Sequence, residues 1–145
     1  MSKNELLINP NTNTHSFGKI PEIKYRNDYF QCGEIYLKQG EHRGINRGFG
    51  AEHIWEAHKK QLITLGYNSI EDVSKFISNI IRLKAPIHCE FDNIRGKHRI
   101  SVITSSIGVA YLEERHDGNN DVFYSVVTAF LTKKTHGILI GNVCF

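Results

Sequence analysis

Residues 47–58 read RGFGAEHIWEAH, a glycine-rich approach that runs directly into a helical pattern. Gly48 and Gly50 allow sharp backbone turns just before the pattern begins. Apolar residues then recur at helical spacing, and Gly66 is typical of the residue that follows a helix end. The stretch predicts a first helix over 51–65. The first turn of a helix offers backbone N–H groups and a partial positive charge, which favour an anion such as phosphate.

A second helix and an antiparallel sheet are expected after this stretch. Residues 69–84 carry a capping-box-like start and a strong apolar stripe, which Pro86 ends. From there the hydrophobic period changes to two, with turn signals between strand-sized runs. The expected strands lie at 87–91, 99–104, 107–113, 122–131 and 138–140. The predicted fold class is α+β, with two N-terminal helices packed on one face of a four- to five-stranded antiparallel sheet.

The N-terminal part of the chain shows weaker patterns. Residues 1–27 are mostly polar with clustered turn signals, and residues 29–38 are compatible with one short strand or helix. We therefore expect residues 1–40 to form a loosely held arm or linker, and residues 41–145 to form the folded domain.

Composition narrows the class of protein. The chain has 145 residues, the size of one domain, and a net charge of +3 that leaves out eight histidines. This mildly basic balance permits a nucleic-acid partner without requiring one. The apolar runs are strand-sized, so no membrane span is expected, and the start of the chain lacks the apolar core of a signal peptide. Three widely spaced cysteines argue against a disulfide framework and against a zinc site of the CxxC type.

The two histidines of the first helix have different expected roles. His53 and His58 are five residues apart, a rotation of about 140° around a helix, so they do not share a face. His58 follows Ile54 by four residues and is expected to be a buried structural histidine. His53 lies in the first turn beside a basic, glycine-rich loop and is the candidate for proton chemistry. Their spacing also excludes the helix of a zinc protease.

Two further candidate sites lie in the expected sheet. Regular alternation over 122–131 places Tyr124 and Thr128 together on the face opposite the helices. They either line a site or reflect the ordinary preference of these residues for strands. Residues 95–99, RGKHR, are the densest cationic patch. This patch is either a phosphate clamp or a solvated hairpin tip that blocks edge pairing.

Several segments, in this order, resemble a known family. RGFGAEHIWEAH is followed by the second helix, by SSIGVAYLEER at 105–115 and by FYSVVTAF at 123–130. Over residues 45–143 they resemble the C-terminal toxin domains of contact-dependent and polymorphic bacterial toxin systems. Those domains look like members of the barnase/EndoU/colicin/RelE ribonuclease superfamily, the BECR fold, including its phage-associated branches.

This resemblance implies a toxin that is a metal-independent ribonuclease, needs no cofactor and often cleaves tRNA. It implies a cognate immunity protein as partner and, after delivery, action in the cytoplasm of a target bacterium. The residues that map to the family's catalytic positions are His53, Lys97, Tyr124 and Thr128. In the EndoU branch two histidines and a lysine act, and the second histidine here would be His42 or His58.

The residue types suit RNA cleavage without a metal. Attack by the 2′-OH needs a base for its proton, an acid for the leaving oxygen, and cations or hydroxyls around the developing charge. His53 would be the base or acid, Lys97 would stabilise charge, and the tyrosine and threonine would hold the scissile phosphate. The residues expected to bind the RNA backbone are Arg43, Arg47, Arg95 and Arg99.

Three other function classes compete with this hypothesis. A non-catalytic RNA-binding module would use the same basic surface without chemistry. An immunity or antitoxin protein more often carries an acidic partner surface, whereas this chain is basic. An ADP-ribosyltransferase toxin needs a cradle for NAD, and no convincing residue set for one is present.

Overall fold

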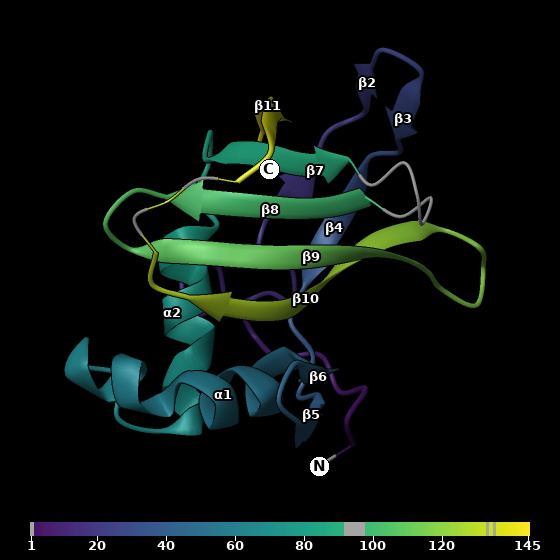
Figure 1. Cartoon of the computed structure of the whole chain (residues 1–145). Coiled ribbons are helices and arrows are strands. Elements are labelled where there is room, and N and C mark those ends of the chain that lie inside the picture. Colours follow the sequence, from purple (N-terminus) through teal and green to yellow (C-terminus); the bar gives the residue numbers. More distant parts are fainter. Residues whose placement is uncertain (1, 92–97, 133, 135) are drawn as a thin grey trace.

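The computed structural model describes residues 2–91, 98–132, 134 and 136–145, and strands dominate it (Figure 1). Six short strands precede the helices: β1 (Lys19–Ile20), β2 (Ile23–Tyr25), β3 (Asp28–Phe30), β4 (Gly33–Tyr36), β5 (Glu41–Gly44) and β6 (Arg47–Phe49). The helical part consists of α1 (Gly50–Thr64), a 3₁₀ turn η1 (Ile70–Asp72) and α2 (Val73–Ile80). The remaining strands are β7 (Pro86–Phe91), β8 (His98–Thr104), β9 (Gly108–His116), β10 (Val122–Phe130) and β11 (Ile138–Asn142).

Seven of these strands form one mixed sheet in the order β1-β4-β10-β9-β8-β7-β11. Its neighbours are antiparallel except β4 and β10, which run parallel. The two pairs β2–β3 and β5–β6 are separate hairpins. The sheet is nearly closed, because Lys19 on β1 forms an isolated bridge with Cys144, just after β11. The Lys19 N–H donates to the Cys144 carbonyl at 2.7 Å, and the Cys144 N–H donates back at 3.0 Å.

The predicted fold class is wrong in its architecture. Six strands come before the first helix, and the sheet has seven strands with one parallel pair instead of four or five antiparallel strands. The last strand, β11, does not pair with β10, which precedes it in the chain. It crosses to pair with β7 at the other side of the meander.

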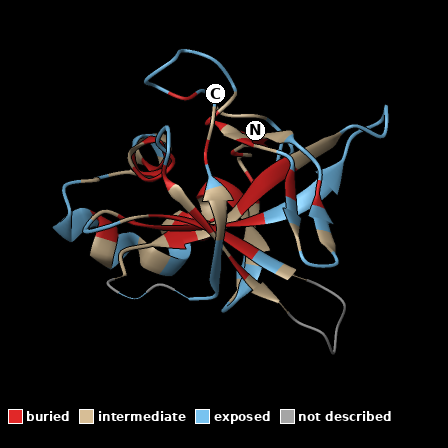
Figure 2. Ribbon diagram, turned by 90° about the horizontal axis from the view of Figure 1, so that it is seen from above, coloured by how far each residue is buried: buried red, intermediate tan, exposed pale blue. Residues whose placement is uncertain are grey.

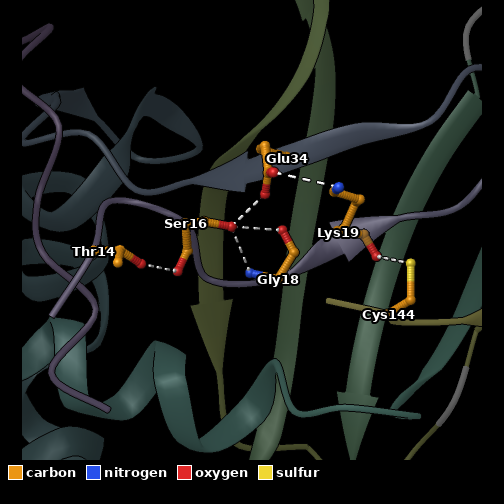
Figure 3. A network of polar contacts seen from close by, with 6 residues as sticks. All are labelled: Thr14, Ser16, Gly18, Lys19, Glu34 and Cys144. Carbon is orange, nitrogen blue, oxygen red and sulfur yellow. Dashed lines mark hydrogen bonds and ion pairs between the residues drawn. The ribbon is translucent and has the colours of Figure 1, made fainter. Parts of the chain in front are cut away.

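Residues 1–40 are not a loosely held arm. They supply β1 and β4 to the main sheet, and Phe17, Ile20 and Ile35 have no exposed surface. Around β1, the Ser16 hydroxyl donates to the Glu34 carboxylate, whose other oxygen lies 3.6 Å from the Lys19 amine (Figure 3). Apolar burial and these contacts make this segment part of the same core as the rest of the chain.

The individual elements after residue 50 match the sequence pattern more closely. α1 lies within a residue of the predicted 51–65, and α2 with η1 falls inside 69–84. The antiparallel meander from β7 to β10 is confirmed. Period and apolar content predict these elements because each one is long enough to show its own pattern.

The main core combines buried residues of α1 and α2 with buried residues of the strands, and buried residues gather in the middle of the molecule (Figure 2). α1 runs alongside β10 in the same direction (Figure 1). The side of strands β7–β10 that faces away from α2 is here called the outer face. It carries a second, smaller apolar cluster of Ile103, Val109 and Tyr111, with Phe130 packed on it.

Candidate functional site

The β5–β6 hairpin packs closely against the start of α1 at Gly48, which has no side chain. His42 lies opposite Gly48 in the hairpin register. Gly48 has φ +138°, and a Cβ at this position would lie 2.9 Å from Nδ1 of His53. Because the residue opposite His42 has no side chain, the His53 imidazole can pack directly against the hairpin. The glycine-rich approach to the helix therefore brings two histidines together.

His42 and His53 form a hydrogen-bonded pair. Their Nδ1 atoms are 3.0 Å apart, and the rings are stacked with centroids 5.2 Å apart and planes inclined by 24°. One Nδ1 donates a proton and the other accepts it. His53 is only 5% exposed, whereas His42 is exposed. Of the two, His42 is the one that a substrate can reach, with His53 behind it.

The surroundings favour the uncharged form of the inner histidine. Burial lowers the pKa of His53 below its ordinary value, and the nearby His42 and His58 lower the pKa further. At neutral pH His53 is therefore uncharged. A neutral His53 can accept a hydrogen bond from a protonated His42, and such charge-assisted bonds are stronger than neutral ones. The pair is suited to take up and release one proton.

The start of α1 is not the open anion site that the sequence suggested. The N–H of Ala51 donates to the Lys38 carbonyl at 3.0 Å, and the N–H of Glu52 donates to the Gln39 carbonyl at 2.9 Å. The Gln39 amide also donates to the Glu52 carboxylate. Two of the N–H groups that a phosphate would use are thus already bonded.

His58 is not part of the hydrogen-bonded histidine pair, although it is close enough to lower the pKa of His53. Its ring packs against Phe130 of β10 with centroids 5.1 Å apart, and burial lowers its pKa. We expected His58 to be the buried histidine, but it is only partly buried, and His53 is buried instead. The hairpin, which local periodicity cannot show, covers His53.

A bulge in β10 separates Tyr124 from Thr128. The pairing with β9 shifts between Val126 and Thr128, so regular alternation breaks there. Tyr124 is in the main core with no exposed surface, and its hydroxyl donates to the Gln31 carbonyl at 2.7 Å. Thr128 instead lies opposite Tyr111 and shares the outer face with it. The expectation that both residues share one face is wrong.

The outer face carries a line of cross-strand neighbours, here called the outer row. Thr128 of β10 lies opposite Tyr111 of β9, Tyr111 lies opposite Ser101 of β8, and Ser101 lies opposite His88 of β7. The guanidinium of Arg99 lies 3.7 Å from the centre of the Tyr111 ring. β6 and α1 both contact β10, so the histidine pair lies beside the strand that begins this row.

The predicted RNA-binding cations fall in two places. Arg43 and Arg47 are exposed on the β5–β6 hairpin, next to His42, and Arg43 lies 3.4 Å from the Glu41 carboxylate. Arg99 is on the outer face. Arg95 and Lys97 lie outside the described residues.

The sequence named His42 only as an alternative to His58 and did not single out Tyr111, Ser101 or His88. The alternation within each strand predicts which face each of these three residues occupies. Only the register between the strands makes them cross-strand neighbours. The pairing of His42 with Gly48 across the hairpin likewise follows from register and not from a local pattern.

Comparison with protein-family models, with curated proteins and with solved structures finds no match. Within the described residues, no group of three or more His, Cys, Asp or Glu side chains is arranged to hold a metal ion. In the same part of the chain, no helix has the length and apolar character needed to cross a membrane.

Proposed function

We propose that this chain is a metal-independent endoribonuclease whose reacting group is His42, assisted by His53. The observation that carries this proposal is the 3.0 Å hydrogen bond between an exposed and a buried histidine. The pair lies next to two exposed arginines and beside a sheet face with polar side chains. These features supply a proton acceptor and an electropositive approach for a phosphodiester.

In the proposed reaction, Nε2 of His42 removes the proton from the ribose 2′-OH. The 2′-oxygen then attacks the phosphorus, the bond to the 5′-oxygen breaks, and a water molecule gives its proton to the leaving 5′-oxygen. The products are a 2′,3′-cyclic phosphate and a 5′-OH, and the hydroxide left from the water takes the proton from His42. The Nδ1–H of the charged His42 donates to the neutral His53, which stabilises the positive ring. Arg43 and Arg47 would balance the charge that develops on the phosphate oxygens.

The resemblance to bacterial toxin domains adds a biological role and a protein partner to this proposal. It suggests a toxin that cleaves tRNA in the cytoplasm of a target bacterium and that a cognate immunity protein neutralises. The test is induced expression in bacteria with and without the neighbouring gene. Growth arrest that the neighbouring gene relieves supports the toxin, and normal growth in both cultures contradicts it.

The nuclease itself is tested with purified protein, total bacterial RNA and EDTA. We expect discrete fragments with the wild type, and a rate lower by about 10²–10⁴ with His42→Ala, because that variant lacks the proton acceptor. His116→Ala is the matched control, since His116 is exposed at the far end of β9. Added salt should weaken RNA binding.

Three outcomes separate the alternatives. Intact RNA with the wild type contradicts the nuclease, and RNA that is bound but intact favours the binding module. Equal cleavage by the wild type and His42→Ala keeps the nuclease and excludes His42 as its reacting group.

A further inference from the structure

The outer face ends in a cavity of about 460 Å³. The turn after α2, the start of β7, the end of β8 and the segment after β10 surround it. Its lining includes Arg82, Leu83, Lys84, Pro86, His88 and Ile103. A volume of this size is typical of sites for small organic molecules.

The lining favours a ligand that has a flat apolar part and a negative charge. Leu83, Pro86 and Ile103 supply apolar surface, and most of the lining is apolar. Arg82 and Lys84 supply two positive charges, and the lining includes no Asp or Glu among the described residues. A base with its attached phosphate combines these two properties.

Lys84, which lines the cavity, has a strained backbone conformation. Lys84 has φ +70°, a conformation that glycine adopts freely and that costs energy for residues with a side chain. Two hydrogen bonds hold it there, from its N–H to the Val143 carbonyl at 2.8 Å and from the Asn142 amide to its own carbonyl at 2.9 Å. A lysine at this position therefore costs stability relative to glycine.

The cavity is continuous with the outer row. His88 is both the last member of that row and a lining residue, and Ile103 of the lining belongs to the outer-face cluster. Since neighbouring strands are about 4.8 Å apart, the row from Thr128 to His88 spans about 14 Å. A strand of RNA whose cleaved bond is next to β10 can reach the cavity along this row.

We infer that the cavity binds one nucleotide of the RNA substrate, remote from the cleaved bond, with Lys84 and Arg82 on its phosphate. This inference rests on the proposed nuclease function and adds a subsite to it. Arg99, whose guanidinium lies over the Tyr111 ring, is beside the outer row. A base of the RNA between the cleaved bond and the cavity can stack on this guanidinium plane.

The first experiment measures binding by NMR with AMP and UMP, and with adenosine and inorganic phosphate for comparison. We expect both nucleotides to shift the amide signals of Thr104, Ser105 and Thr132. The two fragments should shift these signals less at equal concentration, because each lacks half of the ligand. Lys84→Gly should weaken nucleotide binding about tenfold, the usual effect of losing one charged contact.

Lys84→Gly also separates binding from folding. Glycine relieves the strained backbone, so its melting temperature should equal or exceed that of the wild type. The control is Lys24→Gln, which removes an exposed lysine on β2, outside the cavity lining. This control should leave nucleotide binding unchanged.

The second experiment compares cleavage of a dinucleotide and of a hexanucleotide. Lys84→Gly should raise KM for the hexanucleotide about tenfold with kcat unchanged, and should not affect the dinucleotide, which cannot reach the cavity. Equal kinetics of wild type and variant on the hexanucleotide would overturn the inference, as would the absence of nucleotide-dependent shifts around the cavity.

The two proposals fail in different ways. RNA cleavage by the wild type without nucleotide binding in the cavity overturns the subsite alone. Nucleotide binding by a wild type that cleaves no RNA overturns the nuclease, and with it the assignment of the bound nucleotide to a cleaved substrate.

Discussion

At the residue scale, Gly48 and Gly44 offer a controlled test of the histidine pair. Both lie in the same hairpin with φ near +135°, so an alanine at either position suffers the same backbone strain. At Gly48 the added Cβ would also lie 2.3 Å from the Glu41 carbonyl and 2.9 Å from Nδ1 of His53, whereas at Gly44 no described atom lies within 4 Å. We expect Gly48→Ala to lower the free energy of unfolding by about 1–3 kcal/mol more than Gly44→Ala does.

Urea unfolding measures the difference, and the imidazole NMR signals of His42 and His53 report on the pair. These signals should move in Gly48→Ala and stay in place in Gly44→Ala. Equal stability of the two variants, with unchanged imidazole signals in both, would show that the glycine is not needed for the contact.

The lowered pKa of His53 predicts how stability depends on pH. In the folded protein the pKa values of His53, His58 and His88 are all below the ordinary 6.5, mainly through burial. The unfolded chain therefore binds more protons as the pH falls through 6.5. The free energy of unfolding is fully present above that pH and decreases below it, by up to about 1.4 kcal/mol per pH unit for each histidine.

Urea midpoints between pH 8 and pH 5.5 measure this effect. His53→Gln, which cannot titrate, should reduce the loss of stability at acid pH. His116→Gln, at an exposed position, should keep the wild-type profile. A wild-type stability that does not change between pH 7.5 and pH 5.5 would contradict the prediction.

At the element scale, one side chain ties α1 to the end of β10. The N–H of Leu131 donates to Oε1 of Gln61 at 2.7 Å, and Nε2 of Gln61 donates to the Leu131 carbonyl at 3.4 Å. Gln61→Met keeps a side chain of similar size and leaves this partly buried N–H without its partner. We expect a loss of about 1–3 kcal/mol in the free energy of unfolding.

The matched control is Lys60→Met, one residue earlier, on an exposed position of the same helix. It should change stability by less than about 0.5 kcal/mol. Hydrogen exchange gives a second measurement, because Gln61→Met should expose the Leu131 amide. If that amide stays protected, the side chain does not hold the two elements together.

A comparison of the elements also shows which parts of the fold can be predicted from the sequence. Periodicity predicts α1 and the strands of the meander because each extends over several turns or several alternations. β1 to β6 have two to four residues each, too few to show a period. The local sequence does not show the bulge before Thr128 either. Regular alternation therefore placed Tyr124 and Thr128 on the same face, which is wrong. Pairing with β9 decides their true positions.

At the scale of the whole molecule, contacts between distant parts of the chain close the sheet. Lys19 pairs with Cys144, and β4 joins β10 in parallel after more than eighty intervening residues. No local pattern encodes such pairings. They explain why the first forty residues, which have a weak pattern of their own, become part of the core when the C-terminal strands are present.

This closure predicts that residues 41–145 do not fold alone. Without residues 1–40, the sheet loses β1 and β4, and the core loses apolar side chains that include Phe17, Ile35 and Leu37. Each lost large apolar side chain costs about 2–5 kcal/mol, so three of them match the total stability of an ordinary domain. We expect the shortened chain to show no cooperative thermal transition and no dispersed amide signals. Adding residues 1–40 as a separate peptide should restore both, because the missing strands then pair as they do in the intact chain. A cooperative transition of the shortened chain by itself would show instead that β1 and β4 only cover a sheet that is stable without them.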